Sequence, residues 1–230
     1  MVEKLKLVLK TPKLRLGVKA IILALSLSFL PLWASVVVAI VLYFQPMAFS
    51  FSFLGTLISF LIIVITISPL VGEIAYVIAL SALSLSALFY LILGVKNKIF
   101  LNRSLALFTL LAVLISSAIW GFFSGNLSLP VLILLTFLVS RDALVSFAPT
   151  SGRATLFAGI CSLIVVSISW SVWYLNIPVW LATITVFLPF VGVLYMIVKY
   201  FQGELFKSDA LFIAITLAII SYTLWILTAF

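Results

Sequence analysis

The side chains of this chain that are best placed to do chemistry are three charges in segment 140–153, SRDALVSFAPTSGR. Arg141 and Asp142 are adjacent near the end of an apolar run, and Arg153 follows after a short turn. Adjacent opposite charges offset part of the cost of removing each one from water. We interpret Arg141, Asp142 and Arg153 as a cytoplasmic coupling segment that contacts a soluble partner, such as the ATPase of a transport complex. The alternative is an ordinary loop whose arginines only fix the membrane topology.

Most other chemistries need residues that this chain lacks. It contains no histidine, which excludes a histidine-ligated haem, copper or zinc and a Ser–His hydrolase. Its single cysteine, Cys161, excludes an internal disulfide and a cysteine-ligated cluster, and we expect it to be a small buried hydrophobic residue. We therefore expect no catalytic residue, no metal site and no cofactor.

The carboxylates support the same conclusion. The five are Glu3, Glu73, Asp142, Glu204 and Asp209. They form no cluster that could hold Mg²⁺, and neither the Gly-x-Gly-Asp motif of an intramembrane aspartyl protease nor a phosphate-binding loop occurs. The sequence therefore argues against enzymatic activity.

The composition dictates the environment in which these side chains must be positioned. Hydrophobic residues make up 66% of the 230 residues, charged residues only 8%, and the mean hydropathy is +1.46. A soluble domain of this size buries only about 70% of its surface, so lipid must cover the rest. Continuous apolar runs indicate helices rather than alternating strands. We predict an all-α, polytopic transmembrane helix bundle with very short loops, formed by residues 1–230 as one integral membrane domain.

Seven apolar runs have about the length of a membrane-spanning helix, which is roughly 20 residues. They are residues 49–68, 72–94, 104–124, 127–147, 154–175, 179–200 and 211–230. The stretch 19–45 is too long for one ordinary span and short for two, and Pro31 lies near its middle. Residues 1–18 form a basic segment that we expect to be cytoplasmic or interfacial.

The positions of the Lys and Arg residues distinguish between the possible membrane topologies, because cytoplasmic loops carry the excess of Lys and Arg. If stretch 19–45 is a helical hairpin broken at Pro31, every cationic cluster falls on one side. This gives nine crossings, with a cytoplasmic N-terminus and an outer C-terminus. The alternatives are eight crossings, with 19–45 as one kinked helix, or a re-entrant hairpin that satisfies the charges equally well.

Function is less constrained than topology. The net charge of +8 comes from short clusters between apolar runs, so we expect contacts with anionic lipid headgroups and not with nucleic acid. Many spans, minimal loops and segment 140–153 favour a permease-like transport subunit that works with other proteins. The absence of ionisable residues at the centre of any predicted span favours the alternative, a non-catalytic scaffold subunit of a larger membrane complex, for example a respiratory one.

Overall fold

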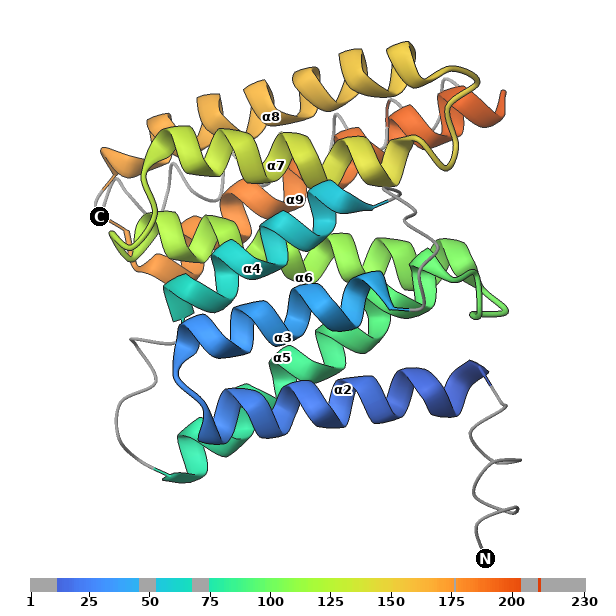
Figure 1. Ribbon diagram of the computed structural model, residues 1–230. Coiled ribbons are helices and arrows are strands. Elements are labelled where there is room, and N and C mark those ends of the chain that lie inside the picture. The colour runs from blue at the N-terminus through green and yellow to red at the C-terminus, as the bar shows by residue number, and fades with distance from the viewer. Residues whose placement is uncertain (1–11, 46–52, 68–74, 176, 204–210, 212–230) are drawn as a thin grey trace, which may run out of the picture. The chain divides into compact units, whose positions relative to one another are not determined.

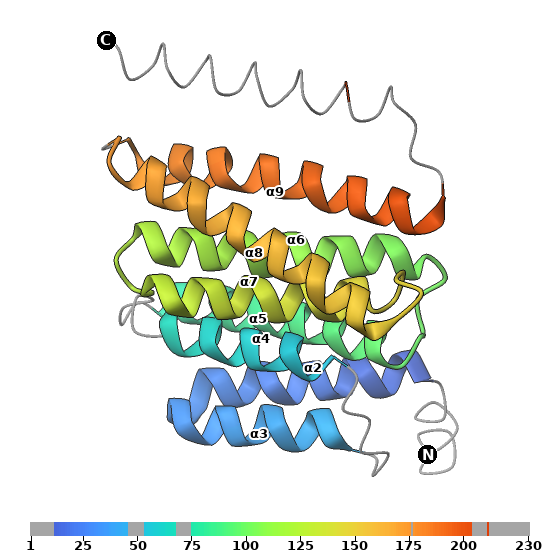
Figure 2. The same ribbon diagram turned by 90° about the horizontal axis from the view of Figure 1, so that it is seen from above.

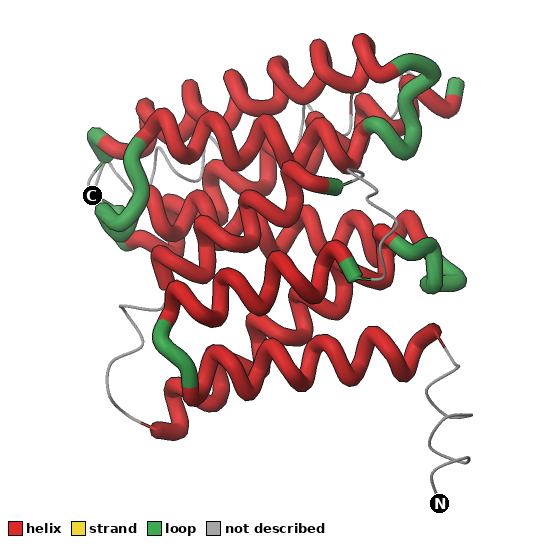
Figure 3. Tube along the Cα trace, in the orientation of Figure 1, coloured by secondary structure: helices red, strands yellow, loops and turns green. Residues whose placement is uncertain are grey.

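The computed structural model describes residues 12–45, 53–67, 75–175, 177–203 and 211, and within these ranges all regular structure is helical (Figures 1 and 3). The predicted all-α class is therefore confirmed for the described residues, whereas the predicted run 212–230 lies outside them. The helices are α2 (Pro12–Phe29), α3 (Leu32–Phe44), α4 (Leu54–Ile67), α5 (Ala75–Lys96), α6 (Arg103–Phe123), α7 (Leu129–Leu144), α8 (Ser151–Trp173) and α9 (Val179–Gln202).

Four of the described helices are long and apolar enough to cross a membrane, which is consistent with an integral membrane protein. They contain the segments Val77–Lys96, Ser104–Phe123, Ser151–Trp173 and Val179–Gln202. Helices α3 and α4 are apolar but shorter. Side chains such as Ile21 and Leu163, which are 60% and 64% exposed, present apolar surface outward. In water this surface would be unfavourable, and in lipid it is not.

Proline and glycine set several helix boundaries, because proline fixes φ and glycine adopts the left-handed conformation without strain. Pro31 and Pro178 directly precede α3 and α9. Gly203 closes α9 with φ of 72°, and Gly125 adopts φ of 76° after α6. These prolines and glycines explain why the apolar runs predicted from the sequence and the observed helices agree within a few residues.

Helices α2 and α3 form an antiparallel hairpin, and the predicted break at Pro31 is confirmed (Figure 1). Near the break, the Ser35 hydroxyl donates to the Ser26 carbonyl oxygen at 2.8 Å. At the open end, Lys19 Nζ donates to the Leu42 carbonyl oxygen at 2.7 Å. Helix α2 begins at Pro12, so the last part of the predicted basic segment 1–18 is helical, whereas residues 1–11 lie outside the described ranges.

The chain divides into two compact units, Met1–Leu110 and Leu111–Phe230, with the boundary inside α6. The single membrane domain predicted for residues 1–230 stays a prediction. In the first unit α2 packs on α3 and α5, and α4 packs on α5. The Phe60 and Phe89 rings, whose centroids are 5.6 Å apart, join α4 to α5. These contacts make α5 a central element of the first unit.

In the second unit α8 packs on both α7 and α9. The buried face of α8 carries mainly small side chains, including Ala154, Ala158, Cys161 and Ser162. Small residues let helix backbones approach closely where no hydrophobic effect drives association. Cys161 is 1% exposed, which confirms the prediction of a small buried residue.

The hydroxyl of Ser169, also on this face of α8, is buried without a hydrogen-bond partner. A buried polar group left unpaired costs about 1–3 kcal/mol. We therefore expect Ser169→Ala to raise the free energy of unfolding by about 1 kcal/mol. Unfolding can be followed with a thiol-reactive dye, because Cys161 is the only cysteine and is buried.

The matched control is Ser162→Ala on the same helix. The Ser162 hydroxyl already donates to the Gly159 carbonyl oxygen at 2.9 Å, so its removal should bring no gain. If Ser169→Ala unfolds at the same temperature as Ser162→Ala, or lower, the hydroxyl is satisfied in the folded protein.

Candidate functional site

Arg141, Asp142 and Arg153 lie together at one end of the α7–α8 hairpin, and we call these three side chains the charged end. Arg141 and Asp142 belong to the last turn of α7, and Arg153 belongs to the first turn of α8. The two helices pack against each other and are joined by a short connection (Figure 2). The structure thus brings the three side chains predicted from the sequence to a common location, on helix ends rather than on a long loop.

Two threonines fix the local geometry of the charged end. The Thr150 hydroxyl caps α8 by accepting a hydrogen bond from the Arg153 backbone N–H at 3.4 Å. Arg141 Nε donates to the Thr155 hydroxyl oxygen at 3.3 Å, which links α7 to α8. The Thr155 hydroxyl in turn donates to the Ser151 carbonyl oxygen at 2.9 Å. Both arginines are therefore carried by helical backbone and not by a flexible loop.

The arginine side chains at the charged end remain exposed, and Asp142 is half-buried. Two exposed guanidinium groups can each make bidentate hydrogen bonds with a carboxylate or a phosphate. Among the residues that the structure describes, no group of three or more His, Cys, Asp and Glu side chains could hold a metal ion. The arrangement is suited to ion pairing with a partner.

The cations of the second unit share one end, judged from the described residues. The Phe157 ring, near the start of α8, contacts the rings of Tyr200 and Phe201 at 5.9 and 5.1 Å between centroids. Lys199 at the end of α9 therefore lies toward the same end of this unit as the charged end. At the other end of α8, Trp173 packs against Phe122 with centroids 5.1 Å apart. The described cations of this unit therefore lie at the end of α8 opposite to Trp173.

In the first unit two lysines have a structural role that the sequence analysis missed. Lys96 Nζ donates to the Tyr43 carbonyl oxygen at 2.8 Å and lies 3.5 Å from the centroid of the Tyr43 ring. Lys19 Nζ donates to the carbonyl oxygens of Leu42 and Gln45. The last carbonyls of a helix lack partners within it and carry partial negative charge. Two lysines from neighbouring helices thus cap the C-terminus of α3.

The sequence contains a weak signal for this capping. The last turn of α3 has no basic residue of its own, although a cation there is favourable. The donors come from other helices. Lys19 of α2 is 23 residues from Leu42, and Lys96 of α5 is 53 residues from Tyr43. Because both ammonium groups are engaged with α3, we do not assign Lys19 and Lys96 to the candidate site.

Comparison of this chain with known protein families, with curated proteins and with solved structures gave no match. The function must therefore be argued from the charged end, from the apolar helices and from the distribution of the cations. None of these features depends on likeness to another protein.

Proposed function

We propose that this chain is a permease-like, transport-type subunit of the membrane, which works with partner proteins, and that its charged end contacts a soluble cytoplasmic partner. The observation that carries the proposal is the placement of Arg141 and Arg153, both exposed, on the two helix ends that adjoin in the α7–α8 hairpin. The planar guanidinium fork loses less conformational freedom per hydrogen bond than a lysine ammonium, which suits arginine to ion pairing between subunits.

The proposal includes a threading with nine crossings, a cytoplasmic N-terminus and an outer C-terminus. Lys19 and Lys96 both reach the C-terminus of α3, so the first half of α2 and the ends of α3 and α5 lie on one side of the first unit. An even number of crossings between Lys19 and Lys96 requires this arrangement. The grouping of Arg141, Arg153 and Lys199 supports the same rule in the second unit.

The short helices leave one alternative to the nine crossings. Helix α3 has 13 residues, or about 20 Å at 1.5 Å per residue, against a hydrocarbon core of about 30 Å. A re-entrant α2–α3 hairpin would put the same cations on the same side. Both versions leave the charged end cytoplasmic, so the proposed partner contact does not depend on the choice.

A second candidate function is a non-catalytic scaffold subunit of a larger membrane complex. It is favoured by the placement of charges, since the charged residues of helices α5 to α9 lie in terminal turns. Transporters that couple to ions usually hold an ionisable group near the middle of the membrane. The identity of the copurified subunits separates the two: a soluble ATPase supports the transport subunit, and membrane oxidoreductase subunits support the scaffold.

The test is the double variant Arg141→Ala with Arg153→Ala, which removes both exposed guanidinium groups. We expect at least a tenfold loss, about 1.4 kcal/mol, in the amount of ATPase retained per chain, because truncating one partner of a charge pair that the interface buries costs about 2–5 kcal/mol. The retained ATPase is measured by mass spectrometry of the intact complex, and flux is measured in liposomes that contain the complex.

The matched control is Lys13→Ala with Lys98→Ala, which removes the same charge from exposed positions of the first unit. Equal ATPase retention in the control and in the arginine variant would assign the effect to net charge. Isolation of the wild-type chain without any ATPase, together with absence of flux, would contradict the proposed function.

A further inference from the structure

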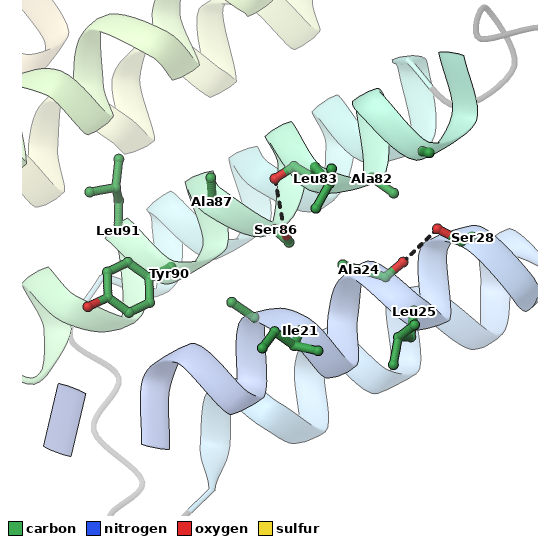
Figure 4. A pocket seen from close by; sticks show the side chains of 12 residues that line it. Ile21, Ala24, Leu25, Ser28, Ala82, Leu83, Ser86, Ala87, Tyr90 and Leu91 are labelled. Carbon is green, nitrogen blue, oxygen red and sulfur yellow. Dashed lines mark hydrogen bonds between the residues drawn. The ribbon is translucent and has the colours of Figure 1, made fainter. Parts of the chain in front are cut away.

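An apolar groove runs between α2 and α5, entirely within the first unit, and has a volume of about 690 Å³. Small side chains form much of its lining, which Figure 4 shows from close by. The lining includes Ala20, Ala24 and Ser28 of α2 and Ala82, Ser86 and Tyr90 of α5. Because α2 and α5 are antiparallel, Ser28 and Ala82 mark one end of the groove, and Ala20 and Tyr90 mark the other.

The hydroxyl groups of the groove have partners within their own helices. The Ser28 hydroxyl donates to the Ala24 carbonyl oxygen at 2.9 Å, and the Ser86 hydroxyl donates to the Leu83 carbonyl oxygen at 2.8 Å (Figure 4). The serine protons are thus already used, and the remaining lining is almost wholly hydrocarbon. A polar solute would lose its hydration here without compensation, so the groove suits an apolar occupant.

The groove is long enough for an extended acyl chain to lie in it. From Ala20 to Ser28 it follows α2 for about 12 Å, at 1.5 Å per residue. Because a phospholipid combines such chains with a charged headgroup, the residues at the ends of the groove decide between apolar occupants.

One end of the groove is positively charged. Lys13 and Gly17 precede Ala20, Ala24 and Ser28 at intervals of three or four residues, so all five share one face of α2. Lys13 is exposed, and a Cβ at Gly17 would meet no atom within 4 Å, so this face is open up to the lysine. The groove therefore continues from hydrocarbon into a cationic surface.

The α5 side of the same end carries an aromatic pair and a second lysine. The Tyr90 and Phe100 rings meet edge to face, with centroids 5.9 Å apart. Lys98 is exposed in the turn between α5 and Phe100. Tyrosine with an apolar body and a polar tip is favoured at the boundary between hydrocarbon and headgroups. Along the groove, a hydrocarbon lining is followed by the aromatic pair and then by the lysines. This order matches the acyl chains and headgroup of a phospholipid.

We propose that the groove between α2 and α5 binds an anionic phospholipid. Its two acyl chains lie along the alanines, and its phosphate lies at the end marked by Lys13. Binding requires only that the chain is embedded in a membrane, so it is independent of the partner contact proposed for Arg141, Asp142 and Arg153.

The test compares the full chain and two variants in nanodiscs with equal phosphatidylglycerol and phosphatidylcholine, by mass spectrometry of retained lipid. Ala24→Phe fills the groove, and we expect it to lower retention of both lipids at least fivefold. Lys13→Gln removes the cation, and we expect it to lower the preference for phosphatidylglycerol about fivefold while phosphatidylcholine is retained as before.

The matched control is Leu163→Phe, at a 64% exposed position of α8. It should not alter retention. If Ala24→Phe fails to fold, Lys13→Gln still decides, because Lys13 is exposed. Unchanged lipid preference in Lys13→Gln would overturn the proposal, as would wild-type protein that shows no preference. A dimer that Ala24→Phe disrupts would instead assign the groove to a second copy of the chain.

Discussion

Replacement of Lys96 by methionine is expected to lower the free energy of unfolding of the first unit by about 2–4 kcal/mol. Methionine keeps the apolar stem but loses the hydrogen bond to the Tyr43 carbonyl oxygen and the contact with the Tyr43 ring. A hydrogen bond from a charged donor contributes about 1.5–3 kcal/mol, and a cation–π contact adds about 0.5–1 kcal/mol. Tyr43 is only 1% exposed, so water cannot readily replace the lost donor.

The measurement places a reporter on the helix that Lys96 caps. Ala39, in α3, is 1% exposed, so Ala39→Cys in a Cys161→Ala background supplies a single thiol that a dye reaches only after α3 detaches. The control is Lys98→Met, which removes the same charge two residues later at an exposed position. If Lys96→Met and Lys98→Met release the thiol at the same temperature, capping of α3 by Lys96 contributes nothing to stability.

The difference between Lys96 and Lys98 also shows what the sequence could reveal. Composition and the spacing of proline and glycine sufficed to predict the helices and the break at Pro31, because both depend on local chemistry. The same reasoning used the cationic clusters, to which Lys19 and Lys96 belong, only as markers of the cytoplasmic side. Their role as caps depends on α2 and α5 meeting at the end of α3, a tertiary contact that no pattern within 20 residues encodes.

The charged end likewise has features that the local sequence predicts and features that depend on tertiary contacts. Arg141, Asp142 and Arg153 were predicted together because two helices joined by a short turn must bring their adjoining ends together. Thr150 could have been recognised from its place before α8, since threonine is a favoured N-cap. The hydrogen bond from Arg141 to Thr155 could not, because it depends on the rotation of α7 against α8. Helix boundaries that local residues set can be predicted from the sequence, whereas the rotation of one packed helix against another cannot.

The capping of α3 by Lys19 and Lys96 constrains the membrane topology of the later helices. If Lys19 and Lys96 cap α3 from the cytoplasmic side, and if helices α6 to α9 each cross the membrane as proposed, the side of every later connection in the described part of the chain follows. In this proposed topology Asn97, Phe147 and Gln202 lie inside, whereas Asn126 and Leu175 lie outside.

Single cysteines at these five positions, in a Cys161→Ala background, should label in an all-or-none pattern with a membrane-impermeant maleimide applied to intact cells. We expect Asn126→Cys and Leu175→Cys to react, because their connections follow the apolar, aromatic ends of α6 and α8. Asn97→Cys, Phe147→Cys and Gln202→Cys should react only after the membrane is permeabilised, since moving the nearby Lys and Arg side chains to the outer leaflet opposes the positive-inside rule. Labelling of Asn97→Cys from outside would invert the map and would place Arg141, Asp142 and Arg153 where no cytoplasmic ATPase can reach them.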